Sequence, residues 1–306
     1  MKFLLFFLLL PPVVLAQPTP ATGIVHTHDV DLAYEVYGAP SSSTPAIVIN
    51  GGPGFLHNYM LLSDVFTGRL AQNRQVIFYD QRGVGKSKLL NPLAPVDMAA
   101  QVADLEAIRA KLGFQTFDII GHSWGGLLAM GYAAAHPDHI HKFVIIDSAA
   151  PKLSQTLFMF KQFYPDELAK EKQQDAVKTS ADSTIESGQS LRRFLRRDFY
   201  SKENFDRYIA PLSDQALADV SNDKMDEAVE KAVTSVDLNP NLHNFHFPAL
   251  IMSGRYDINV APLTAWKIYK AIPNSKLSIF EKSGHFPFYE EEDQFLKVLN
   301  NFLADN

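Results

Sequence analysis

The 306-residue sequence contains no cysteine, and this absence excludes several kinds of chemistry together. A chain without thiols has no disulfide, no thiolate zinc site, no iron–sulfur ligation and no cysteine nucleophile. Charge is also scarce, since 20% of the residues are charged, and 28 Lys and Arg stand against 34 Asp and Glu. The resulting net charge of −6 provides no basic surface field, so we expect no nucleic-acid partner.

What the sequence does contain is enough apolar material, 46% of its residues, for one large α/β domain or two ordinary ones. The apolar stretch at the N-terminus, residues 3–16, is short for a membrane span. It follows Lys2, is broken by Pro11-Pro12 and ends on Ala16, which is typical of a secretory signal peptide over residues 1–16. We therefore expect a periplasmic or secreted protein with no stable membrane association after processing. A retained N-terminal anchor helix is the alternative.

Short apolar runs that end in polar or glycine-rich turns alternate with helical patterns along most of the chain. An alternating pattern over residues 24–37 indicates an antiparallel strand or hairpin at the start. Buried strands are predicted at 46–50, 75–80, 117–120, 142–147, 249–253 and 277–280, and helices at 98–112, after residue 123 and at 293–303. This order predicts an α/β fold with a mainly parallel central sheet and helices on both faces.

Residues 151–241 interrupt this alternation. The segment has no buried-strand run, is rich in charge, and shows helical patterns at 167–177, 191–197 and 224–236. We interpret it as a helical cap inserted between two strands of the sheet. Residues 17–150 and 242–306 would then form the two parts of one α/β core.

A candidate nucleophile lies between a predicted strand and a predicted helix, in the sequence Gly121-His-Ser-Trp-Gly125. This G-x-S-x-G pattern in a strand–turn–helix context is typical of a nucleophile elbow, whose glycines allow a tight turn around a strained serine. The hydroxyl of Ser123 would then lie at a helix N-terminus, where the dipole favours a developing oxyanion. A serine N-cap in a glycine-rich turn is the alternative interpretation.

A serine hydroxyl needs a base, and the base needs a carboxylate that orients it. The chain order Ser–Asp–His that is usual with this elbow points downstream of Ser123. Asp257 and His285 each follow a predicted strand, so both would lie at the sheet edge that carries the serine. Asp147, at the end of the strand after the nucleophile helix, is the rival acid. We favour Asp257 because of its chain order and loop position.

Hydrolysis through a tetrahedral intermediate also needs two hydrogen-bond donors for the oxyanion. We expect the backbone N–H of Trp124, directly after the candidate nucleophile, and that of Gly52 in the early loop Gly51-Gly-Pro-Gly54. The sequence Gly83-Val-Gly-Lys-Ser87 resembles the end of the nucleotide-binding P-loop pattern G-x-x-x-x-G-K-[ST]. The first glycine of that pattern would stand at position 80, which is Asp80, so a nucleotide-binding loop is excluded. We expect no cofactor and no metal.

Five short motifs carry most of this chemistry. They are Gly51-Gly-Pro-Gly54, Tyr79-Asp-Gln-Arg-Gly-Val-Gly-Lys-Ser87, Gly121-His-Ser-Trp-Gly-Gly126, Gly254-Arg-Tyr-Asp257 and Ser283-Gly-His285. Together they resemble the α/β-hydrolase superfamily and, within it, the proline iminopeptidase family. The resemblance covers nearly all of residues 24–303, and the cap matches only in position and helical character. It implies that the D-Q-R-G loop is structural, with Asp80 and Arg82 forming internal hydrogen bonds beneath the active site.

The resemblance also implies that acidic residues, from the cap or next to the catalytic Asp, bind the free amine of the substrate. This chain departs from the family at two positions, with Ile258 where relatives can carry an acid and Asn50 where the family usually has His. We identify Glu203 in the cap as a candidate amine anchor, with a solvated helix charge as the alternative. Phe55 is a candidate substrate contact.

The leading hypothesis is an exported serine aminopeptidase that releases an N-terminal residue, such as proline, from short peptides through an acyl-enzyme. A carboxylesterase or lipase-like hydrolase of small esters would use the same three side chains, and the aromatic residues of the cap would suit an apolar substrate. A ligand-binding receptor on a hydrolase scaffold is the third class, which the complete set of Ser123, Asp257 and His285 argues against. The expected partner is a small molecule or a short peptide.

Overall fold

The computed structural model describes residues 19–304, except for residues 157, 167–168 and 170–182. The predicted signal peptide, residues 1–16, and almost all of the helix predicted at 167–177 lie outside the described residues. No helix in the described part of the chain is long and apolar enough to cross a membrane.

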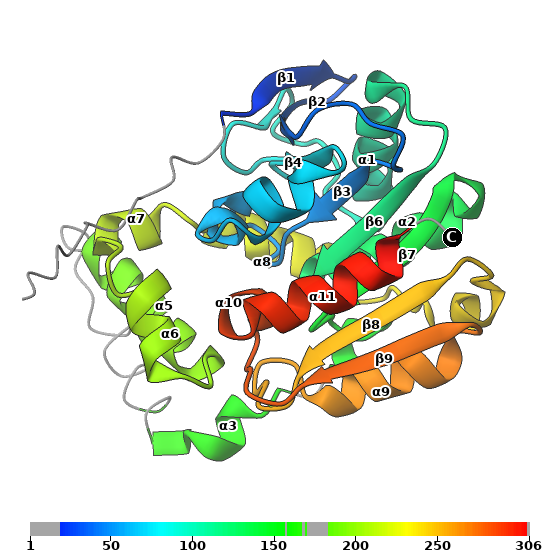
Figure 1. Ribbon diagram of the computed structural model, residues 1–306. Coiled ribbons are helices and arrows are strands. Elements are labelled where there is room, and N and C mark those ends of the chain that lie inside the picture. Colours follow the sequence, from blue (N-terminus) through cyan, green and yellow to red (C-terminus); the bar gives the residue numbers. More distant parts are fainter. Residues whose placement is uncertain (1–18, 157, 167–168, 170–182, 305–306) are drawn as a thin grey trace, which may run out of the picture.

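A nine-stranded sheet forms the centre of the molecule (Figure 1). Its strands are β1 (Ala21–His26), β2 (Val30–Tyr37), β3 (Ala46–Ile49), β4 (Val76–Tyr79), β5 (Lys88–Leu89), β6 (Phe117–His122), β7 (Ile140–Ile146), β8 (Ala249–Gly254) and β9 (Ser275–Phe280). The strand order is β1-β2-β4-β3-β6-β7-β8-β9, and β5 pairs with β2. The pairs of β2 with β1, β4 and β5 are antiparallel. The pairs β4-β3, β3-β6, β6-β7, β7-β8 and β8-β9 are parallel. The predicted α/β class with a mainly parallel sheet is confirmed.

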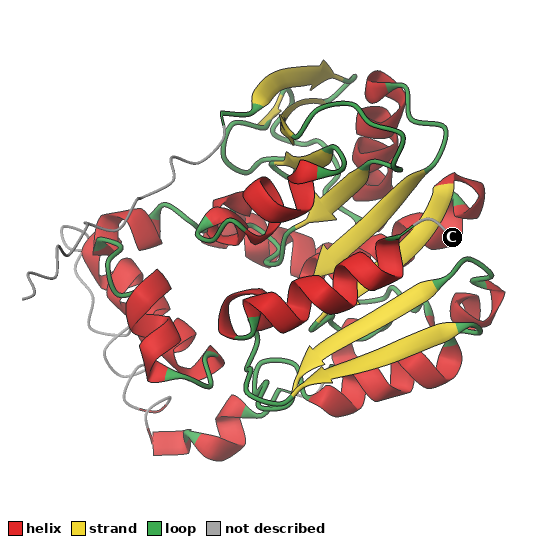
Figure 2. Cartoon of the chain, viewed as in Figure 1, coloured by secondary structure: helices red, strands yellow, loops and turns green. Residues whose placement is uncertain are grey.

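Helices cover both faces of the sheet (Figure 2). They are α1 (Met98–Leu112), α2 (Trp124–Ala135), α9 (Pro262–Ala271), α10 (Pro287–Glu290) and α11 (Glu292–Leu303). Successive strand residues point to opposite faces, and on β3 Ile47 and Ile49 enter an apolar cluster shared with α1, α2 and α9. Ala46 and Val48 enter a second cluster shared with α11. Burial on both faces explains why these strands are continuous apolar runs in the sequence.

The helix predicted at 98–112 forms over those residues, because both of its ends carry strong local signals. The side chain of Asp97 caps the N-terminus by accepting a hydrogen bond from a backbone N–H three residues further on. Gly113 ends the helix in the left-handed conformation, with φ of 73°. Between these ends, Leu105 and Ile108 are fully buried in the core.

The segment between β7 and β8 forms helices in the predicted cap region. They are α3 (Phe160–Phe163), α5 (Ser183–Asp198), α6 (Lys202–Tyr208), α7 (Asp214–Ala218) and α8 (Asp223–Val233). In Figure 1, α5, α6 and α7 lie to the left of the sheet. α8 also packs against the core, since Val229 and Val233 are buried in the same apolar cluster as α1 and α2. The last cap helix therefore connects the cap with the sheet.

Candidate active site

The loops that follow five neighbouring strands meet at one edge of the sheet, because β3, β6, β7, β8 and β9 run parallel. Each of these loops carries a residue identified from the sequence. Gly52 follows β3, Ser123 follows β6, Asp147 follows β7, Asp257 follows β8 and His285 follows β9. The carboxyl edge of a parallel sheet is where α/β proteins place their sites.

Ser123 lies in a sharp turn between β6 and α2, with φ of 55° and ψ of −122°. This conformation is strained for a residue with a side chain, and close packing of the surrounding backbone maintains it. A Cβ atom on Gly121 would lie 2.4 Å from the carbonyl oxygen of Gly125, and a Cβ on Gly125 would lie 2.3 Å from that of Ile49. Both glycines of the G-x-S-x-G pattern are therefore sterically required, and the turn has the geometry of a nucleophile elbow.

His285 and Asp257 are in direct contact. Nδ1 of His285 lies 2.7 Å from Oδ2 of Asp257, and both side chains are buried. The other carboxylate oxygen of Asp257 accepts hydrogen bonds from the backbone N–H groups of Asn259 and Val260, each at 2.8 Å. Burial raises the pKa of Asp257 to about 7, although these N–H groups act in the opposite direction. The carboxylate is held in one orientation and leaves Nε2 of His285 as the nitrogen available for proton transfer.

Asp147, the rival acid, lies beside this pair. Its Oδ1 accepts a hydrogen bond from the backbone N–H of Gly254 at 2.9 Å. One carboxylate oxygen of Asp147, one of Asp257 and a ring nitrogen of His285 lie within 4.8 Å of one another. Burial, and then the neighbouring Asp257, raises the pKa of Asp147 well above its ordinary value. Asp147 is thus the carboxyl that favours the protonated form, while Asp257 makes the hydrogen bond to the histidine.

A cavity of about 360 Å³ lies over this edge of the sheet. Ser123, Trp124, Gly52 and His285 all line it, so the structure brings the predicted nucleophile, base and oxyanion residues to one space. The helix α2 begins at Trp124, and the first N–H groups of a helix have no partner within the helix. Such N–H groups are free to bind a negatively charged oxygen.

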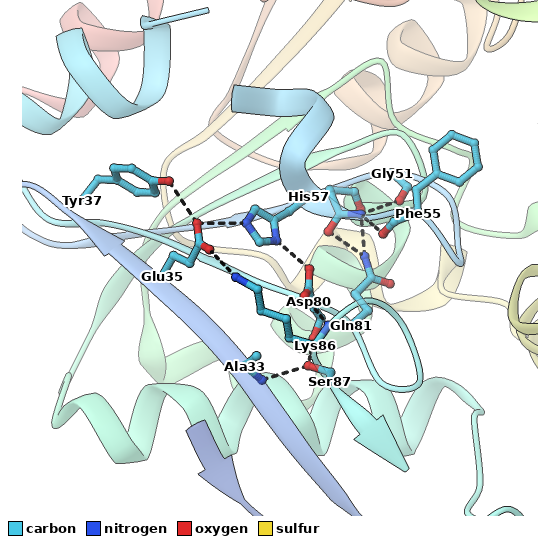
Figure 3. Close-up of polar contacts among 11 residues, drawn as sticks. Ala33, Glu35, Tyr37, Gly51, Phe55, His57, Asp80, Gln81, Lys86 and Ser87 are labelled. Carbon is cyan, nitrogen blue, oxygen red and sulfur yellow. Dashed lines mark hydrogen bonds and ion pairs between the residues drawn. The ribbon is translucent and has the colours of Figure 1, made fainter. Parts of the chain in front are cut away.

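The D-Q-R-G loop makes internal bonds near this site, as the resemblance implied. The guanidinium of Arg82 donates two hydrogen bonds to the buried carboxylate of Asp104, at 2.6 and 2.7 Å. Figure 3 shows His57 between Asp80 and Glu35, with its ring nitrogens 2.8 and 3.3 Å from their carboxylate oxygens. Burial opposes the charged form of His57, but the two carboxylates outweigh burial and raise its pKa to about 9. The loop is therefore anchored by buried ion pairs.

Asn50, at the position where the resemblance implies His, holds the glycine loop directly. Its Nδ2 donates hydrogen bonds to the carbonyl oxygens of Gly51 and Phe55, at 2.8 and 2.7 Å. Nε2 of Gln81 donates to the carbonyl oxygen of Asn50 at 3.0 Å, and Oε1 of Gln81 accepts from the indole N–H of Trp124 at 2.9 Å. One glutamine of the D-Q-R-G loop thus ties the glycine loop to the start of α2.

Sequence reasoning missed His122, which directly precedes the candidate nucleophile. Its buried ring lies between two partners, the hydroxyl of Tyr59 at 2.7 Å from Nδ1 and the carbonyl oxygen of His285 at 2.9 Å from Nε2. The hydroxyl oxygen of Tyr59 accepts a further hydrogen bond from the N–H of Gly51 at 2.6 Å. His122 therefore links the glycine loop to the loop of the candidate base. It occupies a variable position of the G-x-S-x-G pattern, so the motif did not mark it.

The loop of His285 is also tied to the cap. The carboxylate of Glu290 accepts hydrogen bonds from the N–H of Gly284 at 2.6 Å and from the N–H groups of Tyr200 and Ser201 at 3.1 and 2.7 Å. The N–H of His285 itself donates to the carbonyl oxygen at the end of α5 at 2.8 Å. The position of the candidate base therefore depends on the cap as well as on the sheet.

Two cap acids that the sequence analysis did not identify, Asp226 and Glu230 of α8, line the cavity. They are four residues apart and so share one face of the helix. A Cβ atom on Gly54 would lie 3.0 Å from Cβ of Asp226, which places this acid against the glycine loop. Phe55 lines the cavity as well. Glu203, in contrast, is exposed on α6 and does not belong to the cavity wall.

Two groups of His, Asp and Glu side chains in the described residues bring their ligand atoms close together. They are Asp147, Asp257 and His285, and Glu106, His136 and His139. In the first group the carboxylate of Asp257 and Nδ1 of His285 already bond to each other. In the second, both carboxylate oxygens of Glu106 accept hydrogen bonds from Arg109, at 2.9 and 2.7 Å. Because Asp257 and His285 bond to each other and Glu106 is paired with Arg109, we assign a metal to neither group.

The parallel sheet, the serine elbow and the inserted cap define the class of this protein. The chain belongs to the α/β-hydrolase fold family, whose sequence model matches residues 45–292. The resemblance to proline iminopeptidases seen in the motifs is confirmed by overall similarity. The proline iminopeptidase of Lacticaseibacillus rhamnosus (strain Lc 705) is 28% identical over 294 residues, which cover 93% of this chain and 98% of that protein. The proline iminopeptidase of Clostridium botulinum is 30% identical, with 89% and 94% covered.

Solved structures with the same fold include enzymes of another substrate class. An esterase from Exiguobacterium antarcticum superimposes with a TM-score of 0.70 at 21% identity, covering 94% of this chain and 99% of the esterase. At this identity the likeness shows the fold alone.

Proposed function

We propose that this protein is a serine hydrolase of the proline iminopeptidase type, which releases N-terminal residues from short peptides through an acyl-enzyme. In this mechanism Oγ of Ser123 attacks the scissile carbonyl carbon while Nε2 of His285 takes the hydroxyl proton. The N–H groups of Gly52 and Trp124 stabilise the oxyanion, and Asp257 keeps the imidazole oriented. His285 then gives the proton to the leaving nitrogen, and a water deprotonated by the same ring hydrolyses the acyl-enzyme.

The observation that carries the aminopeptidase assignment is the pair of acids in the cavity wall. Asp226 and Glu230 line the same cavity as Ser123, and Asp226 packs against the glycine loop. The ammonium group of an aminopeptidase substrate is attached to the carbon next to the scissile carbonyl. Carboxylates close to the oxyanion donors are the groups that would bind it.

The electrostatics of Asp226 support a role in binding a cation. Burial, together with the neighbouring Glu230 and Asp223, raises the pKa of Asp226 to about 7. Like charges on adjacent turns of one helix destabilise the empty protein. An ammonium group bound beside Asp226 would relieve this repulsion and favour the ionised carboxylate, so substrate binding and deprotonation are linked.

The test is a matched panel of substrates. Prolyl and alanyl p-nitroanilides with a free amine are compared with their N-acetyl counterparts and with short-chain p-nitrophenyl esters, and Ser123→Ala provides the background rate. We expect cleavage of the unblocked amides and a large loss of kcat/KM on acetylation. Turnover of the esters without cleavage of any unblocked aminoacyl amide would reject the aminopeptidase.

A carboxylesterase is the second candidate, because much of the cavity wall is apolar. Leu195 and Leu217 of the cap and Phe286 next to the candidate base all line it. An acyl chain without an amine would bury its surface against these side chains, and each methylene removed from water contributes about 0.8 kcal/mol. In the panel above, this function predicts a preference for longer acyl esters and no benefit from a free amine.

Export is a further part of the proposal and rests on residues 1–16. We expect the mature protein to begin at Gln17. Mass spectrometry of the N-terminal peptide, from protein expressed with its own leader, tests this. A periplasmic or secreted product that starts at residue 17 would support export, and a cell-associated product that retains Met1 would contradict it.

A further inference from the structure

The cavity wall contains a third acid, Asp198, that the proposed mechanism does not use. It is the last residue of α5, it is 0% exposed, and it lines the cavity. Its Oδ2 accepts a hydrogen bond from Nδ2 of Asn259 at 3.3 Å. Its Oδ1 has no hydrogen-bond partner among the described residues. Leaving a buried oxygen without a partner destabilises a folded protein, so this atom calls for a functional explanation.

Asp198 lies on the histidine side of the cavity. Its carbonyl oxygen accepts a hydrogen bond from the N–H of His285 at 2.8 Å. Asn259, which contacts its side chain, donates its own N–H to the carboxylate of Asp257. Asp226, in contrast, packs against the glycine loop. Asp198 and Asp226 are therefore held by opposite halves of the proposed machinery, Asp198 by the base loop and Asp226 by the oxyanion loop.

In the proposed mechanism His285 gives its proton to the leaving nitrogen, so the leaving group has to lie beside that ring. We propose that Oδ1 of Asp198 binds the leaving-group half of the substrate, by donating a hydrogen bond to the carbonyl oxygen of the residue that follows the scissile bond. This inference rests on the proposed acyl transfer from Ser123. The inference predicts that the enzyme cleaves substrates with a peptide leaving group in preference to substrates whose leaving group has no carbonyl.

The protonation of Asp198 supports the role of donor. Burial raises its pKa to about 8, with His285 and Arg197 acting to lower it and Asp257 to raise it. Two further charged groups lie near this end of α5. The guanidinium of Arg196 donates to the carbonyl oxygen of Phe199, and the carboxylate of Glu290 is occupied by backbone N–H groups. At neutral pH the carboxyl of Asp198 is therefore mostly protonated. Its Oδ2 accepts the hydrogen bond from the side-chain amide of Asn259, and its Oδ1 carries the proton. Above pH 8 the ionised form would repel a carbonyl oxygen.

The test compares two substrates that share the prolyl group and differ in the leaving group. Prolyl-glycinamide carries the carbonyl and prolyl p-nitroanilide does not. In Asp198→Ala the kcat/KM ratio of the two should fall about tenfold, which corresponds to the loss of one hydrogen bond. Asp206→Asn, an exposed acid on α6, is the control and should leave the ratio unchanged. An equal loss on both substrates would mean that Asp198 only supports the loop and would overturn the proposal.

A second arm uses Asp198→Asn, in which an amide N–H replaces the carboxyl O–H. In this variant the ratio of kcat/KM for prolyl-glycinamide to that for prolyl p-nitroanilide should be the same at pH 6.5 and pH 9. In the wild type the same ratio should fall as the pH rises through about 8. The arm remains decisive if Asp198→Ala fails to fold. A wild-type ratio that is as flat as that of Asp198→Asn overturns the role of donor.

The same comparison with acetate esters separates this inference from the aminopeptidase assignment. Acetoxyacetamide has a carbonyl in its leaving group, and phenyl acetate does not. If no prolyl substrate is cleaved but the ester pair shows the change in ratio, the aminopeptidase is rejected and the role of Asp198 stands. If prolyl substrates are cleaved with ratios that do not respond to Asp198, the aminopeptidase stands and this inference fails.

Discussion

Nε2 of His122 donates a hydrogen bond to the backbone carbonyl oxygen of His285 at 2.9 Å. A carbonyl only accepts, so Nε2 must carry the proton, and Nδ1 must then accept from the hydroxyl of Tyr59. Burial lowers the pKa of His122 well below its ordinary value, which keeps the ring in this neutral form. The residue before the candidate nucleophile thus positions the loop of the candidate base.

Replacing His122 by Phe should reduce both stability and activity. The change leaves the carbonyl of His285 and the hydroxyl of Tyr59 without their partner, at a cost of ~2–4 kcal/mol in the free energy of unfolding. We expect kcat to fall at least tenfold, because the base loop is no longer held. Urea unfolding and steady-state kinetics measure the two effects. Tyr59→Phe keeps the bond to His285 but also removes the acceptor of the Gly51 N–H, so it tests the glycine-loop side of the link. A kcat of His122→Phe equal to that of the wild type would contradict a positioning role for His122.

Ser123→Ala should lower kcat by roughly 10⁴-fold or more while the protein stays folded. Ser123→Gly should be equally inactive but more stable than the alanine variant, by ~1 kcal/mol. The reason is the φ of 55° at this position, which strains a residue with a Cβ and not a glycine. Thermal unfolding of the two variants gives the difference. Residual activity close to that of the wild type would remove Ser123 from the mechanism, and a less stable glycine variant would show that the turn is unstrained.

Much of the fold could be predicted because its signals are local. The parallel strands are buried on both faces, which requires uninterrupted apolar runs such as that of β3. Asp97 and Gly113 mark the ends of α1. The elbow was visible for a similar reason, since only glycine tolerates the close approaches at Gly121 and Gly125. In each case the structure requires a particular residue type at one position, so the requirement is visible in the sequence.

The cap contacts could not be predicted, because they depend on backbone bonds between distant segments. The N–H of Asn222 donates to the carbonyl oxygen of Gly54, and the N–H of Leu56 donates to that of Val220, both at 2.8 Å. These bonds bring Asp226 to the cavity, and they impose no requirement on side chains. A helical pattern likewise shows which residues share a face and not which face meets the cavity. The resemblance implied an amine-binding acid in the cap, but it does not say which face of α6 meets the cavity, and Glu203 is exposed.

The choice between Asp257 and Asp147 is tested by the matched variants Asp257→Asn and Asp147→Asn. An amide at 257 can stabilise the wrong ring tautomer of His285, so we expect kcat to fall by about 10³–10⁴-fold, as in known serine triads. An amide at 147 removes only the neighbouring carboxyl, and the loss should be below tenfold. Kinetics at pH 8 on one activated ester decide the question. The opposite order would make Asp147 the acid.

Asp226→Asn should weaken the binding of substrates with a free amine. We expect KM for prolyl p-nitroanilide to rise at least tenfold, because a charge-assisted hydrogen bond is lost, and a much smaller effect on p-nitrophenyl acetate, which has no amine. In the wild type, KM for the amide should rise as the pH falls through about 7, where Asp226 takes up a proton, and this dependence should disappear in the variant. Equal effects on amide and ester would contradict an amine anchor.

Asp198→Asn should stabilise the protein, and the gain should grow with pH. The pKa of Asp198 is about 8 in the folded protein and close to 4 in the unfolded chain, so between these values the folded state binds a proton that the unfolded state releases. Stability of the wild type therefore falls as the pH rises across this window, and an amide does not titrate. Between pH 5 and pH 8 we expect the difference in unfolding free energy between variant and wild type to increase by about 3–4 kcal/mol.

Urea unfolding at the two pH values measures this increase. Asp147 and Asp226 also have raised pKa values, but they titrate in both proteins and cancel in the difference. The unfolding free energy that the wild type loses at pH 8 then results from the buried carboxyl of Asp198, which is the proposed proton donor beside the candidate base. A difference that does not change with pH would mean that Asp198 is already ionised at pH 5. Its free oxygen would then be an acceptor, and the leaving-group carbonyl would have no donor there.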